Sequence, residues 1–207
     1  GKAERVPAYR LLAVRGLDGN RRRHDTPIVG RDAELAALDK AYCEVREGQT
    51  VRLVTVVGDA GVGKSRLVHE AVERVAGGAR VLRGRCLPYG DGITFWPLLM
   101  MVREAADIGD TDSPEIAQAK LLAAVGDAEV ADRLASAAGL TTASFPLAEL
   151  NWAARKFFER WASAGPLVVF VDDIHWAEPA FLDLLLHVQS TAVDAPILLL
   201  TAARHDL

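Results

Sequence analysis

The chain is poor in cysteine and has no long apolar run. Its 207 residues include two cysteines, Cys43 and Cys86, which do not have the spacing of a metal site. Two isolated cysteines argue against a disulfide scaffold and fit a reducing compartment, so we expect a cytoplasmic location. No stretch approaches the roughly 18 apolar residues that a membrane helix requires. We therefore expect no membrane contact.

The sequence also has little excess charge of either sign. Its net charge is −4, from 24 Lys and Arg against 28 Asp and Glu. Such a balance gives no overall bias toward nucleic acid or anionic membranes. One basic run, RRRH, occurs at residues 21–24. We interpret it as a solvated linker rather than a nucleic-acid patch, and predict no direct nucleic-acid binding.

The apolar residues, 50% of the chain, are enough for one α/β domain with a sizeable core. Helical patterns alternate with strand-like runs at 51–57, 79–82, 167–171 and 197–202. This alternation predicts βαβ crossovers, and hence a parallel sheet with helices on both faces. The alanine-rich region from residue 96 to about residue 140 predicts a helical insert.

The helical patterns also predict boundaries and core positions. We expect Asp32 to cap the first helix and Gly48 to end it. Apolar residues recur at helical spacing within it, at Leu35, Leu38, Tyr42 and Val45. Large side chains in the later helical patterns are expected to fill the core, namely Trp96, Trp152, Trp161, Met100 and Met101.

The most specific motif follows the first strand-like run. Residues 58–65 read GDAGVGKS and match the phosphate loop G-x-x-x-x-G-K-[ST]. Glycines let the backbone curl so that its N–H groups point at phosphate oxygens, and the next helix adds its positive N-terminal end. Lys64 is expected to reach the β- and γ-phosphates, and the Ser65 hydroxyl to ligate Mg²⁺. The flanking strand and helix disfavour the alternative, a glycine-rich turn without a ligand.

An acidic pair follows the apolar run at 167–171. A P-loop enzyme needs a carboxylate at such a strand end to hold Mg²⁺, and we assign that role to Asp172. Asp173 is predicted to polarise the attacking water as a general base. The alternative is that both acids cap the next helix. Because aspartate is shorter than the glutamate of many ATPases, we expect slow hydrolysis.

Polar residues also close the run at 197–202. Thr201 or Arg204 is a candidate sensor of the γ-phosphate, and Arg204 has the fixed charge and forked donors that suit this role. The alternative for Arg204 is a surface position just past a strand. His175 and Trp176, which follow the acidic pair, are interpreted as an aromatic wedge under the site.

Four segments in order resemble the signal-transduction (STAND) class of AAA-like P-loop ATPases. They are residues 28–35, 56–67, 171–179 and 200–204. The resemblance implies ATP or ADP with Mg²⁺ as ligands, Gly30 and Arg31 in the adenine pocket, and Arg204 as the strand-end sensor. Together with the motif, it implies nucleotide contacts from Gly30, Arg31, Gly58, Asp59, Ala60, Gly61, Val62, Gly63, Lys64, Ser65 and Arg66. Lys64, Asp173 and Arg204 would be catalytic, and Ser65 and Asp172 would bind the metal.

Two further segments resemble parts of bacterial multidomain regulators. Residues 84–98 are similar to a segment of regulators that join this ATPase to a class III nucleotide cyclase or a LuxR-type DNA-binding domain. Residues 1–12 look like the tail of a class III cyclase domain. We therefore expect a cyclase-like tail and linker at 1–27 and an ATPase domain at 28–207. The class has a five-stranded core sheet, so its fifth strand is expected after residue 207.

The resemblance implies a slow Mg-ATP switch that regulates a covalently linked, cyclase-like effector domain upstream. The alternative is a nucleotide-binding oligomerisation or interaction module of a LuxR-type regulator, with little hydrolysis. Self-association is expected in that case.

Overall fold

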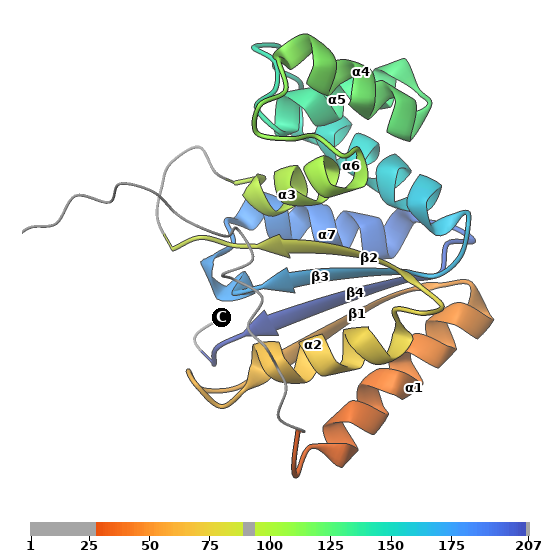
Figure 1. The fold of residues 1–207 in the computed structure, drawn as a ribbon, viewed down its shortest axis with the longest axis vertical. Helices are drawn as coiled ribbons and strands as arrows, with labels where there is room; N and C mark the ends of the chain where they lie inside the picture. Colours follow the sequence, from red (N-terminus) through yellow and green to blue (C-terminus); the bar gives the residue numbers. More distant parts are fainter. Residues whose placement is uncertain (1–27, 89–93, 206–207) are drawn as a thin grey trace, which may run out of the picture.

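The computed structural model describes residues 28–88 and 94–205 (Figure 1). The expected cyclase-like tail and linker at 1–27, which include the basic run at 21–24, lie outside these residues. So do residues 89–93 of the segment that resembles bacterial regulators. These expectations stay predictions.

Four parallel strands form one sheet in the order β1-β4-β3-β2. The strands are β1 Val51–Val57, β2 Arg80–Arg85, β3 Leu167–Asp172 and β4 Ile197–Ala203. Every residue of β4 is buried, as expected for a central strand covered on both faces. The predicted α/β fold with a parallel sheet is confirmed. The fifth strand implied by the resemblance would lie beyond residue 207 and stays a prediction.

Helices cover both faces of this sheet (Figure 1). On one face lie α1 Asp32–Gly48 and α2 Lys64–Val75; on the other lie α3 Trp96–Ala105, α6 Leu147–Ala162 and α7 Pro179–Thr191. The helices α4 Pro114–Val125 and α5 Ala128–Ala137 pack beyond α6, away from the sheet. Among the described residues, no helix combines the length and the apolar character needed to span a bilayer.

Alternation along β3 divides the core into two clusters. Leu167, Val169 and Val171 pack with α3, α6 and α7, whereas Val168 and Phe170 pack with α1 and α2. Successive side chains of a strand point to opposite faces, so one apolar strand supplies both clusters. The sheet is thereby packed between two layers of helices. Polar side chains gather at the carboxyl ends of its strands.

β2 extends three residues beyond the predicted run at 79–82. It pairs with β3 along its whole length, so that Arg85 lies opposite Asp172. In the sequence the arginines at positions 83 and 85 resemble loop composition, but the pairing with β3 continues through both positions, and the Arg83 N–H donates to Glu104 Oε2 on α3 at 3.2 Å. Their side chains therefore stand on the sheet rather than on a loop.

Helix α3 lies close against β2 at Gly84. A Cβ atom at this position would stand 2.7 Å from Met101 Cε and 2.8 Å from both the Cβ and the carbonyl oxygen of Pro97. Such distances are shorter than ordinary carbon contacts of roughly 3.5–4.0 Å. Only glycine permits this approach, which sets the distance between α3 and the strand that carries Arg85.

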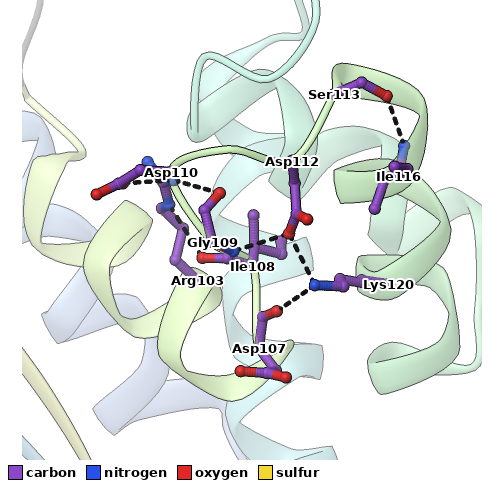
Figure 2. Close-up of polar contacts among 9 residues, drawn as sticks. All are labelled: Arg103, Asp107, Ile108, Gly109, Asp110, Asp112, Ser113, Ile116 and Lys120. Carbon is purple, nitrogen blue, oxygen red and sulfur yellow. Dashed lines mark hydrogen bonds and ion pairs between the residues drawn. The ribbon is translucent and has the colours of Figure 1, made fainter.

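Two cationic side chains hold the connection between α3 and α4 (Figure 2). Lys120 Nζ donates to the Asp107 carbonyl and to Asp112 Oδ2, both at 2.7 Å. Arg103 Nη2 donates to the Gly109 carbonyl at 2.9 Å. The hydrogen bond from Lys120, helped by the Gly109 N–H, holds the pKa of Asp112 below its usual value. Lys120 and Arg103, both on helices of the insert, thus balance the negative charges of Asp112 and Asp110 in this connection.

Helix α1 ends at Gly48, as predicted, but Asp32 is not its cap. Arg31 is the N-cap residue and makes no capping hydrogen bond through its side chain, while Asp32 lies in the first turn. An acid in the first turn still interacts favourably with the helix dipole. At the other end Gly48 is the last helical residue, and the C-cap is Gln49, which adopts the left-handed conformation with φ 51° and donates its N–H to the Val45 carbonyl.

The core predictions for the large side chains of the helices are correct only in part. Met101 is buried, but its neighbour Met100 is 37% exposed, since adjacent helical residues point about 100° apart. Trp96 is 36% exposed and is therefore not a core residue. Trp152 and Trp161 are partly buried against the larger cluster.

Candidate functional site

The carboxyl ends of the strands meet at one edge of the sheet and form a cleft with a volume of about 530 Å³. This is the edge at which parallel α/β sheets bind ligands. The phosphate-loop segment lines it with Ala60, Gly61, Gly63, Lys64, Ser65 and Arg66. The strand ends contribute Arg83, Arg85, Asp172, Asp173 and Arg204. The cleft thus joins the three motifs predicted from sequence.

The phosphate loop connects β1 to α2 and depends on its glycines. Gly61 has φ 82° and Gly63 has φ 93°, in the left-handed region that side chains disfavour. Gly63 is the N-cap of α2, and the first turn of this helix contains no acidic residue. The amides of a helix N-terminus lack intrahelical partners and favour an anion. The local backbone therefore suits a phosphate group.

Lys64 folds back over this loop. Its Nζ donates to the carbonyls of Gly58 at 2.7 Å and Asp59 at 2.9 Å. An ammonium group has three donors, so one N–H remains beyond these two bonds. The side chain lines the cleft, which is where a lysine predicted to contact phosphates is needed.

Ser65 and Asp172 are adjacent in space although 107 residues separate them. Ser65 Oγ donates to Asp172 Oδ1 at 3.1 Å, and the Asp173 N–H donates to the same oxygen at 3.0 Å. A hydroxyl and a carboxylate are the hard oxygen donors that Mg²⁺ prefers, usually with waters and substrate phosphates. The described residues include no cluster of three or more His, Cys, Asp or Glu side chains that could hold a metal. The pair fits a magnesium ion whose coordination is completed by phosphate.

Asp173 is bound by a residue that sequence reasoning missed. Its Oδ2 accepts hydrogen bonds from Arg85 Nε at 2.9 Å and Arg85 Nη2 at 2.7 Å. Asp173 has φ 54° and precedes the 3₁₀ turn η2 Ile174–Trp176, but its side chain makes no capping hydrogen bond. The helix-capping alternative is therefore not supported for this acid. The alternation of arginines at positions 83 and 85 is the sequence signal that could have extended β2 to include Arg85.

Of the two candidate sensors, only Arg204 lines the cleft. Thr201 is buried within the sheet, and its Oγ1 donates to Thr55 Oγ1 at 2.9 Å. These residues face each other in the β1–β4 register, so the hydroxyl is used between strands. The prediction of Thr201 as a phosphate sensor is therefore wrong.

The segment before α1 contacts the phosphate loop. Arg31 Nη2 donates to the Val62 carbonyl at 3.2 Å, and Arg31 Nη1 donates to Glu34 Oε1 at 2.7 Å. Gly30 has φ 71°. Neither Gly30 nor Arg31 lines the 530 Å³ cleft. Their expected place beside adenine stays a prediction.

The turn after the acidic pair does not form the predicted aromatic wedge. Ile174 is the buried residue of η2, whereas Trp176 is 44% exposed. The His175 ring lies 5.1 Å from the Trp176 ring, and its two nitrogens are shielded from solvent without a hydrogen-bond partner in the described residues. In a three-residue turn the side chains point in different directions, so only one of them enters the core.

Electrostatics in the cleft are mixed but positive overall. Four arginines and Lys64 line it, against the two aspartates. Behind the acidic pair, Cys86 donates its N–H to the Asp172 carbonyl at 3.0 Å. Burial, and then the charges of Asp173 and Asp172, raise the pKa of the Cys86 thiol to about 12. The cleft thus favours a polyanion, and the thiol beneath it stays protonated.

The sequence of the chain is similar to known proteins. The AAA ATPase domain family matches residues 27–200. An uncharacterized protein from Rhizobium meliloti (strain 1021) is 33% identical over 191 residues, an alignment that covers 86% of this chain and 18% of the relative. The chain therefore spans less than a fifth of that relative's length. Since the family covers most of the chain, including all of the cleft except Arg204, the protein belongs to the AAA ATPase domain family.

Proposed function

We propose that the cleft binds Mg-ATP and hydrolyses it slowly. The observation that carries this proposal is the contact of 3.1 Å between Ser65 Oγ and Asp172 Oδ1, directly beside the phosphate loop. Membership of the AAA ATPase domain family supports nucleotide binding. The resemblance to STAND ATPases supports ATP over other nucleotides.

Each residue has a specific task in this proposal. The loop amides and Lys64 would bind the phosphates, and Ser65 and Asp172 would hold magnesium, which when bound neutralises phosphate charge. Asp173 would take a proton from the water that attacks the γ-phosphorus. The bond to the bridging oxygen breaks, and ADP and inorganic phosphate leave. Arg204 would contact the γ-phosphate.

Slow turnover follows from the surroundings of Asp173. Arg85 occupies Oδ2 with two hydrogen bonds, and this oxygen is one of two that could accept the proton. An aspartate also reaches less far toward a water than a glutamate. Both features favour a site that spends much of its time with nucleotide bound.

We infer that this slow cycle acts as a switch on a linked effector. A γ-phosphate can bias a conformational equilibrium only if one state contacts it more strongly than the other. The similarity of residues 1–12 to a cyclase tail suggests a nucleotide cyclase as that effector, with a boundary near residue 28. ATP is available in the cytoplasm, which is the location we propose.

The Arg85–Asp173 ion pair also favours a second candidate function. A site whose general base is held by an arginine suits a nucleotide-binding module that docks partners or self-associates with little hydrolysis, as in LuxR-type regulators. Single-turnover measurements separate the two functions. A cycling switch releases ADP and phosphate, whereas the module retains its nucleotide and changes its sedimentation when nucleotide binds.

Calorimetric titration with ATP and ADP, each with and without Mg²⁺, tests nucleotide binding. We expect Lys64→Ala to weaken ATP binding by about 10-fold to 100-fold, because a charge-assisted hydrogen bond is worth about 1.5–3 kcal/mol. Lys40→Ala is the matched control, since Lys40 is 77% exposed on α1 and lies 3.8 Å from Glu44. If neither this chain nor a longer one extended past residue 207 binds ATP, the proposal is wrong.

A further inference from the structure

Helices α4 and α5 leave a groove between them at the end of the molecule beyond α6 (Figure 1). Its volume is about 280 Å³, which is roughly nine times the ~30 Å³ that a water molecule occupies in the liquid. Its lining consists of Glu115, Gln118, Ala119 and Leu122 of α4 and of Ala128, Ala131, Asp132 and Ala135 of α5. None of these residues lines the 530 Å³ cleft, so the groove has no part in the proposed nucleotide chemistry.

Both helices present the same spacing to this groove. The lining residues fall at i, i+3, i+4 and i+7 on α4, from Glu115 to Leu122, and again on α5, from Ala128 to Ala135. This spacing places the side chains in one stripe along each helix. Four of the eight residues are alanines, which leave room for larger side chains from outside. Two stripes that share a groove are the arrangement into which the ridge of a third helix packs.

Helix α4 carries apolar side chains on its exposed side as well as on its buried side. Leu121 and Val125 are buried, whereas Leu122 is 44% exposed and Ile116 is 49% exposed. A helix that is apolar all round is normally covered on every side. Since Leu122 lines the groove, a partner seated in the groove would cover it.

The acids of the groove differ from their neighbours in the insert. Asp110 and Asp112 are each paired with a cation of the insert. Glu115 and Asp132 make no ion pair within the part of the chain that the structure describes, and one lies on each wall of the groove. The hydrogen bond from the Ser113 hydroxyl holds the pKa of Glu115 below its usual value, so this carboxylate is charged at neutral pH. The groove is therefore apolar at its centre and negative on both sides.

We propose that this groove binds a basic amphipathic helix of a partner protein. Large apolar side chains of that helix would enter between α4 and α5 and cover Leu122, as in other helix-in-groove complexes. Lysines or arginines on the two sides of its apolar stripe would pair with Glu115 and Asp132. The same groove of a second copy is a poor partner, because it would place acid against acid. An anionic membrane surface is disfavoured for the same reason.

Calorimetric titration of the full chain with synthetic peptides tests this proposal. The probe is a peptide of about 18 residues, or five helical turns, with Leu at i, i+3, i+4 and i+7 and Lys on both sides of that stripe. One control peptide has the same composition in scrambled order, and another has Glu in place of Lys. We expect the probe to bind about 10-fold more tightly than either control, and its affinity to fall as salt is added.

Two sets of variants locate the binding on the groove. Ala119→Phe should fill the groove and weaken the probe by about 10-fold or more. Glu115→Gln combined with Asp132→Asn should weaken it by about 4-fold to 25-fold, since each exposed ion pair contributes about 2-fold to 5-fold. The matched control is Glu129→Gln combined with Asp183→Asn, which removes two exposed acids outside the groove and should leave the affinity unchanged. Thermal unfolding checks that each variant keeps its fold.

Each contradicting outcome is specific. The proposal is overturned if the probe does not bind, if the scrambled peptide binds equally well, or if Ala119→Phe binds the probe like the wild type. Sedimentation of the chain alone gives a further check: a dimer that Ala119→Phe dissociates would make the occupant a second copy and would also overturn the proposal. Because the groove and the cleft share no residue, ATP binding should be unchanged in Ala119→Phe, and the two proposals stand or fall separately.

Discussion

Replacing Gly84 by alanine should destabilise the domain through the packing of α3 on β2. The added Cβ would lie 2.7 Å from Met101 Cε and 2.8 Å from two atoms of Pro97, one of them the backbone carbonyl oxygen. The methionine end can rotate away, but the carbonyl moves only with the helix. The clash therefore has to be relieved by separating α3 from the sheet.

The magnitude follows from two opposing effects. Overpacking a close contact costs about 1–3 kcal/mol. Replacing glycine by alanine also restricts the unfolded chain, which returns about 0.4–1 kcal/mol. We expect a net loss of about 1–2 kcal/mol in the free energy of unfolding. For a chain of this size, 1 kcal/mol corresponds to about 2–4 °C, so the Tm should fall by about 2–8 °C.

Urea unfolding followed by circular dichroism, together with a thermal melt, measures this change. Gly77→Ala is the matched control, because a Cβ at that position meets no atom within 4 Å. It should leave the urea midpoint unchanged or raise it slightly. If Gly84→Ala is as stable as Gly77→Ala, with an unchanged m-value, the close approach of α3 to β2 does not limit the packing and the reasoning is refuted.

Three further measurements address the site and the insert. Ser65→Ala should lower ATP affinity about 10-fold in Mg²⁺ and leave the Mg²⁺-free affinity unchanged, because the proposed function gives this hydroxyl to the metal; calorimetry measures both affinities. At pH 8, a thiol reagent should label half-buried Cys43 much faster than buried Cys86, because burial is the main cause that raises the pKa of the Cys86 thiol to about 12. Mass spectrometry of timed samples measures the labelling rate of each cysteine. Lys120→Met should lower stability to urea above pH 3.8, the usual pKa of Asp112, and the difference should disappear as the pH falls through the lowered pKa.

Each of these measurements has a control and a contradicting result. Ser190→Ala controls for the loss of a hydroxyl, because Ser190 Oγ is exposed and donates only to helix carbonyls such as that of Leu186. If Ser65→Ala has the same Mg²⁺ dependence of ATP binding as the wild type, Ser65 is not a metal ligand. Unfolding in urea should equalise the two thiols, and equal labelling of the folded chain contradicts the burial. Lys156→Met removes a surface lysine that contacts Glu159, and a pH profile like that of Lys120→Met would show that the Asp112 contact has no special effect.

The sequence predicts the phosphate loop and the acidic pair because their signals are local. A strand, a glycine-rich turn with Lys64 and Ser65, and a helix follow one another within residues 51–75. Asp172 ends an apolar run whose burial is expected from composition alone. Parallel topology then requires these strand ends to share an edge.

Tertiary structure decided what depends on residues far apart in the chain. Arg85 and Asp173 are 88 residues apart, and the strand that carries Arg85 forms only because it pairs with β3. The burial of Thr201 between β4 and β1 likewise follows from strand register. Local pattern predicts which segments bind phosphate and metal, but pairing across the sheet determines that Arg85 meets Asp173. The first depends on neighbouring residues in the chain, and the second on contacts that only folding creates.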